Sequence, residues 1–331
     1  MLSLKRSTWI YLLCGYSFLY LVIHLYTLSI SPLPWFDETY MASIANEFIE
    51  TGKLFPRVAQ VRQMDQELIY GPVYFAITGS FIKLFGLSLV PFRLTTFLSG
   101  LLVIGMATQL LKSLISNRKS VGLFAIALSL DPFLTRSMHE GRMDLLALFF
   151  VLTASHYFIQ FFQTKHVQSV IWAAVFSLLA LLTTPRTGFF FTAWLGIWIY
   201  WLIKNPAHVL KPALYCLGIV LTGYSLWVWY AFGNYAAFFS YYEQYLMFTR
   251  LNLAETSIMK QQYLLIFLGF ISTSVGVIRF RQTYFQMTIC IALLSILCFY
   301  AMVFDQGPYA VFIVPSYYLI IFATMSRLMD S

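Results

Sequence analysis

Charged residues are scarce in this chain. Lys, Arg, Asp and Glu together make up 10% of its 331 residues, whereas hydrophobic residues make up 60%. A soluble globule needs more polar surface than this composition supplies, and the mean hydropathy of +0.75 points the same way. The composition therefore excludes a soluble globular protein and predicts an integral membrane protein.

Several motifs of soluble enzymes and metal sites are missing as well. The sequence has no glycine-rich phosphate loop, Walker pattern, nucleophile elbow or strong internal repeat. All four cysteines lie inside apolar runs, which favours a small hydrophobic role over a disulfide or a metal ligand. His139 and Glu140 begin an H-E-x-x-H pattern, but position 143 is Met, so zinc is not expected. The net charge of +8 indicates membrane insertion and contact with anionic lipids rather than nucleic-acid binding.

Long apolar runs take up most of the chain. A helix needs about 20 residues to cross about 30 Å of hydrocarbon at about 1.5 Å per residue. The sequence therefore predicts an all-α polytopic bundle of about ten transmembrane helices. The expected spans are residues 9–30, 94–115, 120–135, 144–163, 169–184, 189–203, 212–232, 262–280, 283–304 and 309–326.

Basic residues set the expected orientation, because loops rich in Lys and Arg stay in the cytoplasm. The basic loops all fall on the cytoplasmic side only if the short apolar segment 72–86, which carries Lys83, lies on the outer surface of the membrane and does not cross it. We therefore expect residues 1–331 to form a single transmembrane domain without a soluble C-terminal domain. The first outer loop, 31–92, is expected to carry amphipathic interfacial helices. The basic clusters are Lys5-Arg6, residues 117–119, 165–166, 204–211 and 279–282, and Arg327.

Acidic side chains fall almost entirely on the expected outer face, with Asp330 as the exception. Asp37 and Glu38 follow the first span directly, and apolar residues spaced by three and four predict an amphipathic helix from this pair to Gly52. One interpretation is that Asp37 only caps this helix. The other is that the pair is reactive, because the prolines before it hold both carboxylates close to the lipid headgroups.

A second outer loop gathers five charged or titratable residues within nine positions. Charges at the mouth of a helical bundle are costly unless they are paired or functional. Arg142 and Asp144 can therefore form an ion pair that anchors the next helix, or they can take part in a reactive site. The five residues are Arg136, His139, Glu140, Arg142 and Asp144.

Arg186 lies in a very short outer turn and departs from the distribution of the other basic residues. Its side chain can reach up to lipid headgroups. Alternatively, it can join Arg136 and Arg142 in a cationic pocket for a phosphate, because a planar guanidinium matches two phosphate oxygens at once.

Four segments of the chain carry a resemblance to a known family. They are Pro34-Trp35-Phe36-Asp37-Glu38, Gly71-Pro72-Val73-Tyr74-Phe75, Phe85-Gly86 followed by Arg93, and Arg142-Met143-Asp144. Together these segments resemble the GT-C membrane glycosyltransferases. More narrowly, they are similar to glycosyltransferase family 39 and to its aminoarabinose-transferase and protein-mannosyltransferase-like members, over roughly residues 5–200. The resemblance implies a GT-C-like helical bundle.

The resemblance implies roles for the acidic residues. In the family, the carboxylate after the first span is the catalytic base or positions it, and Asp37 with Glu38 beside it matches this place. A second acidic position of the family best matches Asp144, with Glu140 as the alternative.

The resemblance also implies a site for the donor phosphate. Arg186 matches a basic residue of the family, and Arg142 and Arg136 are further candidates. Many members carry Lys or His before two prolines ahead of the interfacial helix, whereas this chain has Tyr70-Gly71-Pro72, so this phosphate contact lacks its basic residue.

The implied reaction moves a sugar from a polyprenyl-phosphate donor to a glycan, lipid or protein acceptor at the outer membrane face, by single displacement with inversion. Arginines neutralise the departing phosphate and a carboxylate takes the acceptor proton, so no metal or other cofactor is required. The expected location is a bacterial inner membrane with the site on the periplasmic side. A lipid or solute transporter, a flippase and a non-catalytic envelope-assembly subunit are the alternatives, although transporters usually place charges near the middle of their spans.

The orientation can be tested with reporters for the two sides of the membrane. A reporter inserted after Arg118 is expected in the cytoplasm and one inserted after Asp305 outside it, because basic loops are retained inside. Activity of periplasmic and cytoplasmic reporters at the two positions measures this. The reverse pattern would mean that segment 72–86 crosses the membrane.

Overall fold

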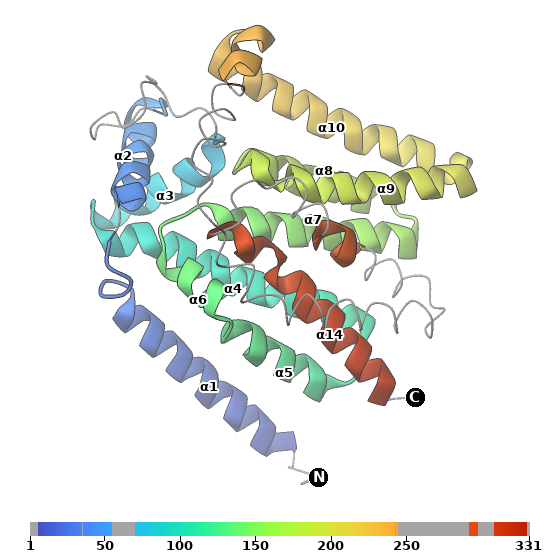
Figure 1. Cartoon of the computed structure of the whole chain (residues 1–331), viewed down its shortest axis with the longest axis horizontal. Coiled ribbons are helices and arrows are strands. Elements are labelled where there is room, and N and C mark those ends of the chain that lie inside the picture. The colour runs from blue at the N-terminus through green and yellow to red at the C-terminus, as the bar shows by residue number, and fades with distance from the viewer. Residues whose placement is uncertain are drawn as a thin grey trace.

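The structure is a computed structural model, which describes residues 6–34, 36–54, 70–241, 243, 291–296 and 308–329. In these ranges all the regular secondary structure is helical (Figure 1). The helices in chain order are α1 (Arg6–Thr27), α2 (Phe36–Thr51), α3 (Pro72–Phe85), α4 (Leu89–Leu114), α5 (Arg118–Ser129), α6 (Pro132–His139), α7 (Asp144–Thr164), α8 (Val167–Leu181), the 3-10 helix η1 (Pro185–Thr187), α9 (Gly188–Lys204), α10 (Pro206–Phe232), the 3-10 helix η2 (Pro308–Ile313) and α14 (Val314–Met329).

Four helical segments of the described chain are long and apolar enough to cross a membrane, and the pair α5 and α6 makes a fifth if it counts as one span. The chain is therefore a multi-pass integral membrane protein. The expected number of about ten spans stays a prediction, because the expected span 262–280 and most of 283–304 lie outside the described residues. The four segments are Leu89–Leu114, Asp144–Thr164, Pro206–Phe232 and Tyr309–Ser326.

The expected span over 120–135 consists of two helices, α5 and α6, rather than one continuous helix. The chain bends by 56° between α5 and α6. Asp131 begins a new helix there, since its carboxylate accepts hydrogen bonds from the N–H groups of Phe133 (2.9 Å) and Leu134 (3.0 Å). Pro132 occupies the first turn of α6, where its missing N–H does no harm.

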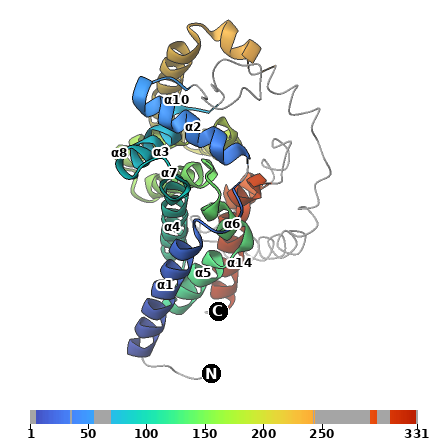
Figure 2. The ribbon, with the colours of Figure 1, turned by 90° about the vertical axis from the view of Figure 1, so that its left-hand side faces the viewer.

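The helix expected after the first span is present as α2. It begins at the acidic pair, buries Ile44 and Ala45 on one side, and ends before Gly52, whose φ of +74° suits glycine. Helix α3 packs against α2 and α4. Both α2 and α3 lie beyond the C-terminal end of α1 (Figures 1 and 2). The placement of residues 72–86 on the outer surface stays a prediction.

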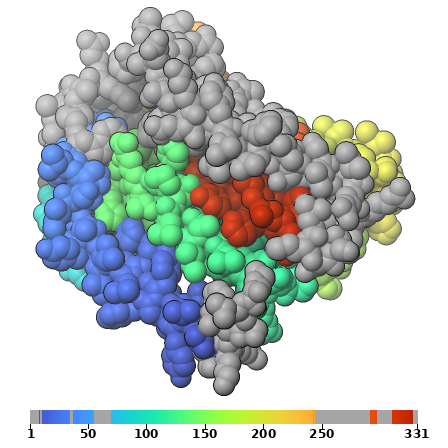
Figure 3. Space-filling view, turned by 60° about the horizontal axis from the view of Figure 1, so that its bottom comes forward, coloured from blue at the N-terminus to red at the C-terminus, as the bar shows by residue number. Residues whose placement is uncertain are grey.

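Helix α7 lies at the centre of the bundle and packs against α4, α6, α8 and both 3-10 helices. Its burial is high, 78% of its most apolar stretch, because neighbours cover it on several sides. Helices η2 and α14 return from the C-terminal part of the chain to pack beside α5 and α6 (Figure 3). This return brings residue 309 to the N-terminal end of α7, where the charged loop lies.

A close backbone contact joins the start of α3 to the end of α8. The N–H of Val73 donates a hydrogen bond to the carbonyl oxygen of Leu182 at 3.2 Å. A Cβ atom on Gly71 would lie 2.1 Å from that same oxygen, so only glycine permits the approach. The contact brings the neighbouring Tyr70 next to η1, which carries Arg186.

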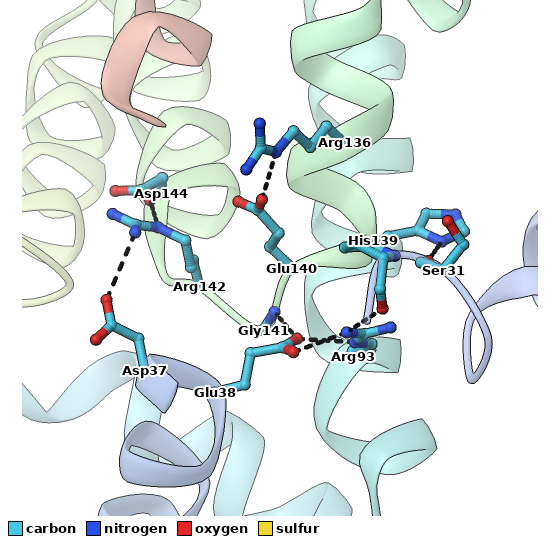
Figure 4. Close-up of polar contacts among 11 residues, drawn as sticks. Ser31, Asp37, Glu38, Arg93, Arg136, His139, Glu140, Gly141, Arg142 and Asp144 are labelled. Atoms are coloured by element: carbon cyan, nitrogen blue, oxygen red, sulfur yellow. Dashed lines mark hydrogen bonds and ion pairs between the residues drawn. The ribbon is translucent and has the colours of Figure 1, made fainter. Parts of the chain in front are cut away.

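A buried ion pair fixes the start of α2 to the start of α4. Arg93 and Glu38 are 0% and 1% exposed, and the guanidinium meets the carboxylate through two parallel hydrogen bonds of 2.7 Å (Figure 4). Removing both charges from water is costly, and such a pair is tolerated only with good geometry and further hydrogen bonds. Both conditions are met here.

The further hydrogen bonds attach two more segments to this pair. Arg93 also donates to the carbonyl oxygens of Leu28 and Pro32, each at 2.9 Å, in the segment that follows α1. The N–H of Gly141, in the loop between α6 and α7, donates to Glu38 Oε1 at 2.9 Å. We call these five residues the junction, because they join the end of α1, the start of α2, the start of α4 and the α6–α7 loop.

The junction predicts an asymmetric response of stability to substitution. Glu38→Leu leaves the Arg93 charge buried without its partner and is expected to destabilise the fold by about 3–5 kcal/mol, whereas Glu38→Leu with Arg93→Met should lose less. Thermal unfolding of the purified variants in detergent measures both. A double variant less stable than Glu38→Leu would contradict this account of the pair.

Candidate active site

Asp37, Arg142 and Asp144 come together at the N-terminal end of α7, as the close-up shows (Figure 4). The Nε of Arg142 donates a 2.7 Å hydrogen bond to Asp144 Oδ2, and its Nη1 lies 4.0 Å from Asp37 Oδ2. Asp37 is 47% exposed, whereas Arg142 and Asp144 are 11% and 3% exposed. The group therefore presents one open carboxylate beside a buried and oriented guanidinium.

Local structure explains these positions. Asp37 lies in the first turn of α2, where the helix dipole stabilises a negative charge. Arg142 lies in the short loop before α7, in a turn where its N–H donates to the Glu140 carbonyl at 2.8 Å. Asp144 is the first residue of α7. The two carboxylates thus occupy helix N-termini, and Arg142 lies between them.

The Arg142 cation is held firmly in its charged form. Burial by itself would lower the pKa of the guanidinium, but the charge of Asp144 and the hydrogen bond to it outweigh burial and raise the pKa above its usual range. The guanidinium therefore stays positive at every physiological pH.

Arg186 is held between two tyrosines. Its Nη1 donates a 3.0 Å hydrogen bond to the Tyr70 hydroxyl, and its guanidinium carbon lies 3.9 Å from the centre of the Tyr309 ring. The guanidinium carbon of Arg142 lies 4.9 Å from the centre of the same ring. Both arginines thus contact Tyr309, whose π-electrons attract cations and offset part of the repulsion between like charges. Tyr309 therefore links the two guanidinium groups through a shared ring.

One oxygen of Asp144 has no hydrogen-bond partner within the described part of the chain. Oδ1 is buried, while Oδ2 accepts the bond from Arg142. A buried carboxylate oxygen left unpaired is unfavourable, so Oδ1 is suited to receive a hydrogen bond from a bound molecule.

The remaining predicted residues of the second loop form separate contacts. Arg136 is 73% exposed and pairs with Glu140 at 2.6 Å, and its side chain turns toward Glu140 rather than toward Asp37 (Figure 4). His139 is buried between α1 and the segment after it: Nδ1 lies 2.7 Å from the Ser31 carbonyl oxygen and Nε2 lies 2.7 Å from Nδ1 of His24. A carbonyl only accepts, so Nδ1 of His139 carries the proton and its Nε2 accepts from His24 in the neutral form.

The structure thus unites Asp37, Arg142 and Asp144, and it joins Arg186 and Tyr70 to them through Tyr309. Glu38 lies beneath this group in the junction. Arg142 and Asp144 form the expected ion pair. The other interpretation, that they take part in a reactive site, stays a prediction.

Three residues of the junction and the site were missed as functional candidates. Arg93 is a charged residue inside an apolar helix, which is a recognisable signal. Gly141 and Tyr309 carry no comparable signal, since their importance comes from neighbours distant in sequence. Within the described ranges no group of three or more His, Cys, Asp and Glu side chains is arranged to hold a metal ion.

Comparisons with known proteins find a likeness in fold without a match in sequence. No protein-family model matches the chain, and no curated protein sequence matches it either. A crystal structure of ArnT from Cupriavidus metallidurans bound to undecaprenyl phosphate superposes with a TM-score of 0.68 at 18% identity, over 98% of this chain and 61% of ArnT. The apo form of the same protein gives a TM-score of 0.60 at 19% identity, over 97% of this chain and 59% of ArnT.

The chain therefore spans about three fifths of the length of the structures it resembles. The likeness extends over nearly all of this chain. It confirms the architecture that the sequence resemblance implied, because the chain has the GT-C-like helical fold of ArnT.

Proposed function

We propose that the protein transfers a sugar from a polyprenyl-phosphate carrier to an acceptor at the outer face of the membrane. One observation carries the proposal: an open carboxylate, Asp37, lies 4.0 Å from the guanidinium of Arg142, and Arg142 and Arg186 both contact the ring of Tyr309. The ArnT structure with the same fold holds undecaprenyl phosphate, which supports an anionic lipid carrier as the ligand of these arginines.

The arginines suit the leaving group. In a displacement at the anomeric carbon, the bond from that carbon to the phosphate oxygen breaks, and the phosphate gains negative charge as it leaves. Arg142 and Arg186 are already oriented, by Asp144 and by Tyr70 respectively, so they can stabilise this charge with little rearrangement. Arg136, exposed and paired with Glu140, is the least suited of the three predicted arginines.

Asp37 suits the role of general base. The acceptor oxygen or nitrogen attacks the anomeric carbon on the face opposite the phosphate, and its proton passes to the Asp37 carboxylate. The configuration at the anomeric carbon inverts in this single step. Asp144, with one oxygen on Arg142 and the other unpaired, is suited to hold a hydroxyl or amino group of the bound sugar.

The catalytic role of Asp37 is tested by Asp37→Asn, which keeps the shape of the side chain and removes the base. General-base help contributes about 10²- to 10⁴-fold, so transfer from a labelled polyprenyl-phosphate sugar in proteoliposomes should fall by at least about 10²-fold. Glu50→Gln, on the exposed side of α2, is the matched control and should keep the activity. Movement of the labelled lipid across the bilayer without product would favour a transporter, and neither movement nor product an assembly subunit.

The phosphate role of Arg186 is tested by binding rather than turnover. Losing hydrogen bonds to a charged group costs about 1.5–3 kcal/mol, so Arg186→Ala should weaken binding of undecaprenyl phosphate about 10- to 100-fold. Arg186→Lys keeps the charge but lacks the planar guanidinium, so its affinity for undecaprenyl phosphate should lie between those of the wild type and Arg186→Ala. Arg136→Ala is the matched control and should keep the affinity of the wild type. A larger loss of affinity in Arg136→Ala than in Arg186→Ala would mean that the phosphate binds at Arg136 instead.

A further inference from the structure

We propose that Glu38 is a positioning residue: its hydrogen bond to the Gly141 amide sets the spacing between Asp37 and Arg142. This inference rests on the proposed function, since it concerns how the base and the phosphate-binding arginine of that site are held. It assigns to Glu38 and Gly141 a task distinct from chemistry on the substrate.

The sequence positions of the two bonded residues are the first argument. Glu38 directly follows Asp37, and Gly141 directly precedes Arg142. The 2.9 Å bond from the Gly141 N–H to Glu38 Oε1 therefore joins the immediate neighbours of the two site residues. Any change in this bond alters the distance between the Asp37 carboxylate and the Arg142 guanidinium, which is 4.0 Å at its closest.

The contacts of Glu38 are the second argument. Oε1 accepts from Arg93 Nε and from the Gly141 amide, and Oε2 accepts from Arg93 Nη2. The side chain is 1% exposed, whereas Asp37 beside it is 47% exposed. A carboxylate engaged by three donors and closed to solvent holds structure together, and the open Asp37 is left to meet the substrate.

The packing around Gly141 is the third argument. A Cβ atom at this position would lie 1.7 Å from Cε1 of Phe92, which is itself 1% exposed. Phe92 precedes Arg93 in α4, so the loop is pressed against the same turn of α4 that supplies the ion pair. Only a residue without a side chain lets the amide reach Glu38, and the sequence provides glycine there.

A second attachment keeps the loop from rotating about this bond. His139, two residues before Gly141, is hydrogen-bonded to the carbonyl oxygen of Ser31 at 2.7 Å. The carbonyls on either side, of Leu28 and Pro32, are bound by Arg93. The α6–α7 loop is thus tied at two points to elements that are themselves tied together, as a precise site requires.

The first experiment displaces the α6–α7 loop without substituting either residue of the Arg93–Glu38 ion pair. Gly141→Ala is expected to lower kcat for sugar transfer about 10- to 100-fold, because a misplacement of about 1 Å has an effect of this size. The apparent KM for the lipid donor should change less, since Arg186 is held by Tyr70 and Tyr309 outside the loop. Hydrogen exchange of the peptide containing residues 140–143 should become faster, with the rest of the protein unchanged.

Two companion variants complete this experiment. Phe92→Leu in the Gly141→Ala background makes room for the new methyl group and should restore part of kcat and of the exchange protection. Gly105→Ala, on the same helix α4 with no atom near its Cβ, is the matched control and should behave as the wild type. Wild-type kcat and exchange in Gly141→Ala would overturn the inference.

The second experiment separates positioning from catalysis at Glu38. Glu38→Gln keeps an oxygen that accepts from the Gly141 amide, whereas Glu38→Ala does not, so the first should retain far more of kcat than the second, with the pH profile of the wild type. A loss in Glu38→Gln as complete as in Asp37→Asn would overturn the positioning role. A wild type that transfers no sugar would instead remove the proposed function.

Discussion

The structure depends on one buried ion pair. Arg93 and Glu38 are almost completely removed from solvent, and a pair in this position is tolerated because every guanidinium nitrogen and both carboxylate oxygens take part in hydrogen bonds. Their partners besides each other are the backbone groups of the segment after α1 and of the α6–α7 loop. Because the two buried charges need these hydrogen bonds, they fix the relative positions of four segments of the chain. Asp37 and Arg142 of the candidate site lie on two of these segments.

The site itself meets a different constraint, which is to hold two positive groups close together in a poorly solvated place. Asp144 compensates Arg142 directly, and Tyr309 lies against both guanidinium groups. The tyrosine attracts each cation without neutralising it, so the pair keeps its net positive charge for an anion. A second carboxylate at hydrogen-bond distance would weaken the attraction for a phosphate, and Asp37 lies 4.0 Å from Arg142.

A fold likeness at 18% identity is understandable for a protein of this kind. A membrane bundle asks most of its residues only to be apolar and of suitable size, so sequences diverge widely while the packing of the helices is retained. The residues under tighter demands are few and scattered. In this chain they are mostly the charged groups near the N-termini of α2, α4 and α7 and the glycines at close approaches, such as Gly71 and Gly141.

The sequence by itself determined the membrane character, the helix that starts at the Asp37-Glu38 pair, the central helix that starts at Asp144 and the loops in which the charges gather, because hydrophobic periodicity and charge are local properties. The sequence also contains a signal for the break at Asp131-Pro132, because Asp followed by Pro favours the start of a new helix even inside an apolar run. Only the tertiary structure decided which charges meet. Glu38 forms an ion pair with Arg93 and so lies outside the group of Asp37, Arg142 and Asp144. Tyr309 contacts Arg186, although more than a hundred residues separate the two in the sequence. The physical reason is that contacts between distant segments follow from how whole helices pack, and no local pattern specifies that packing.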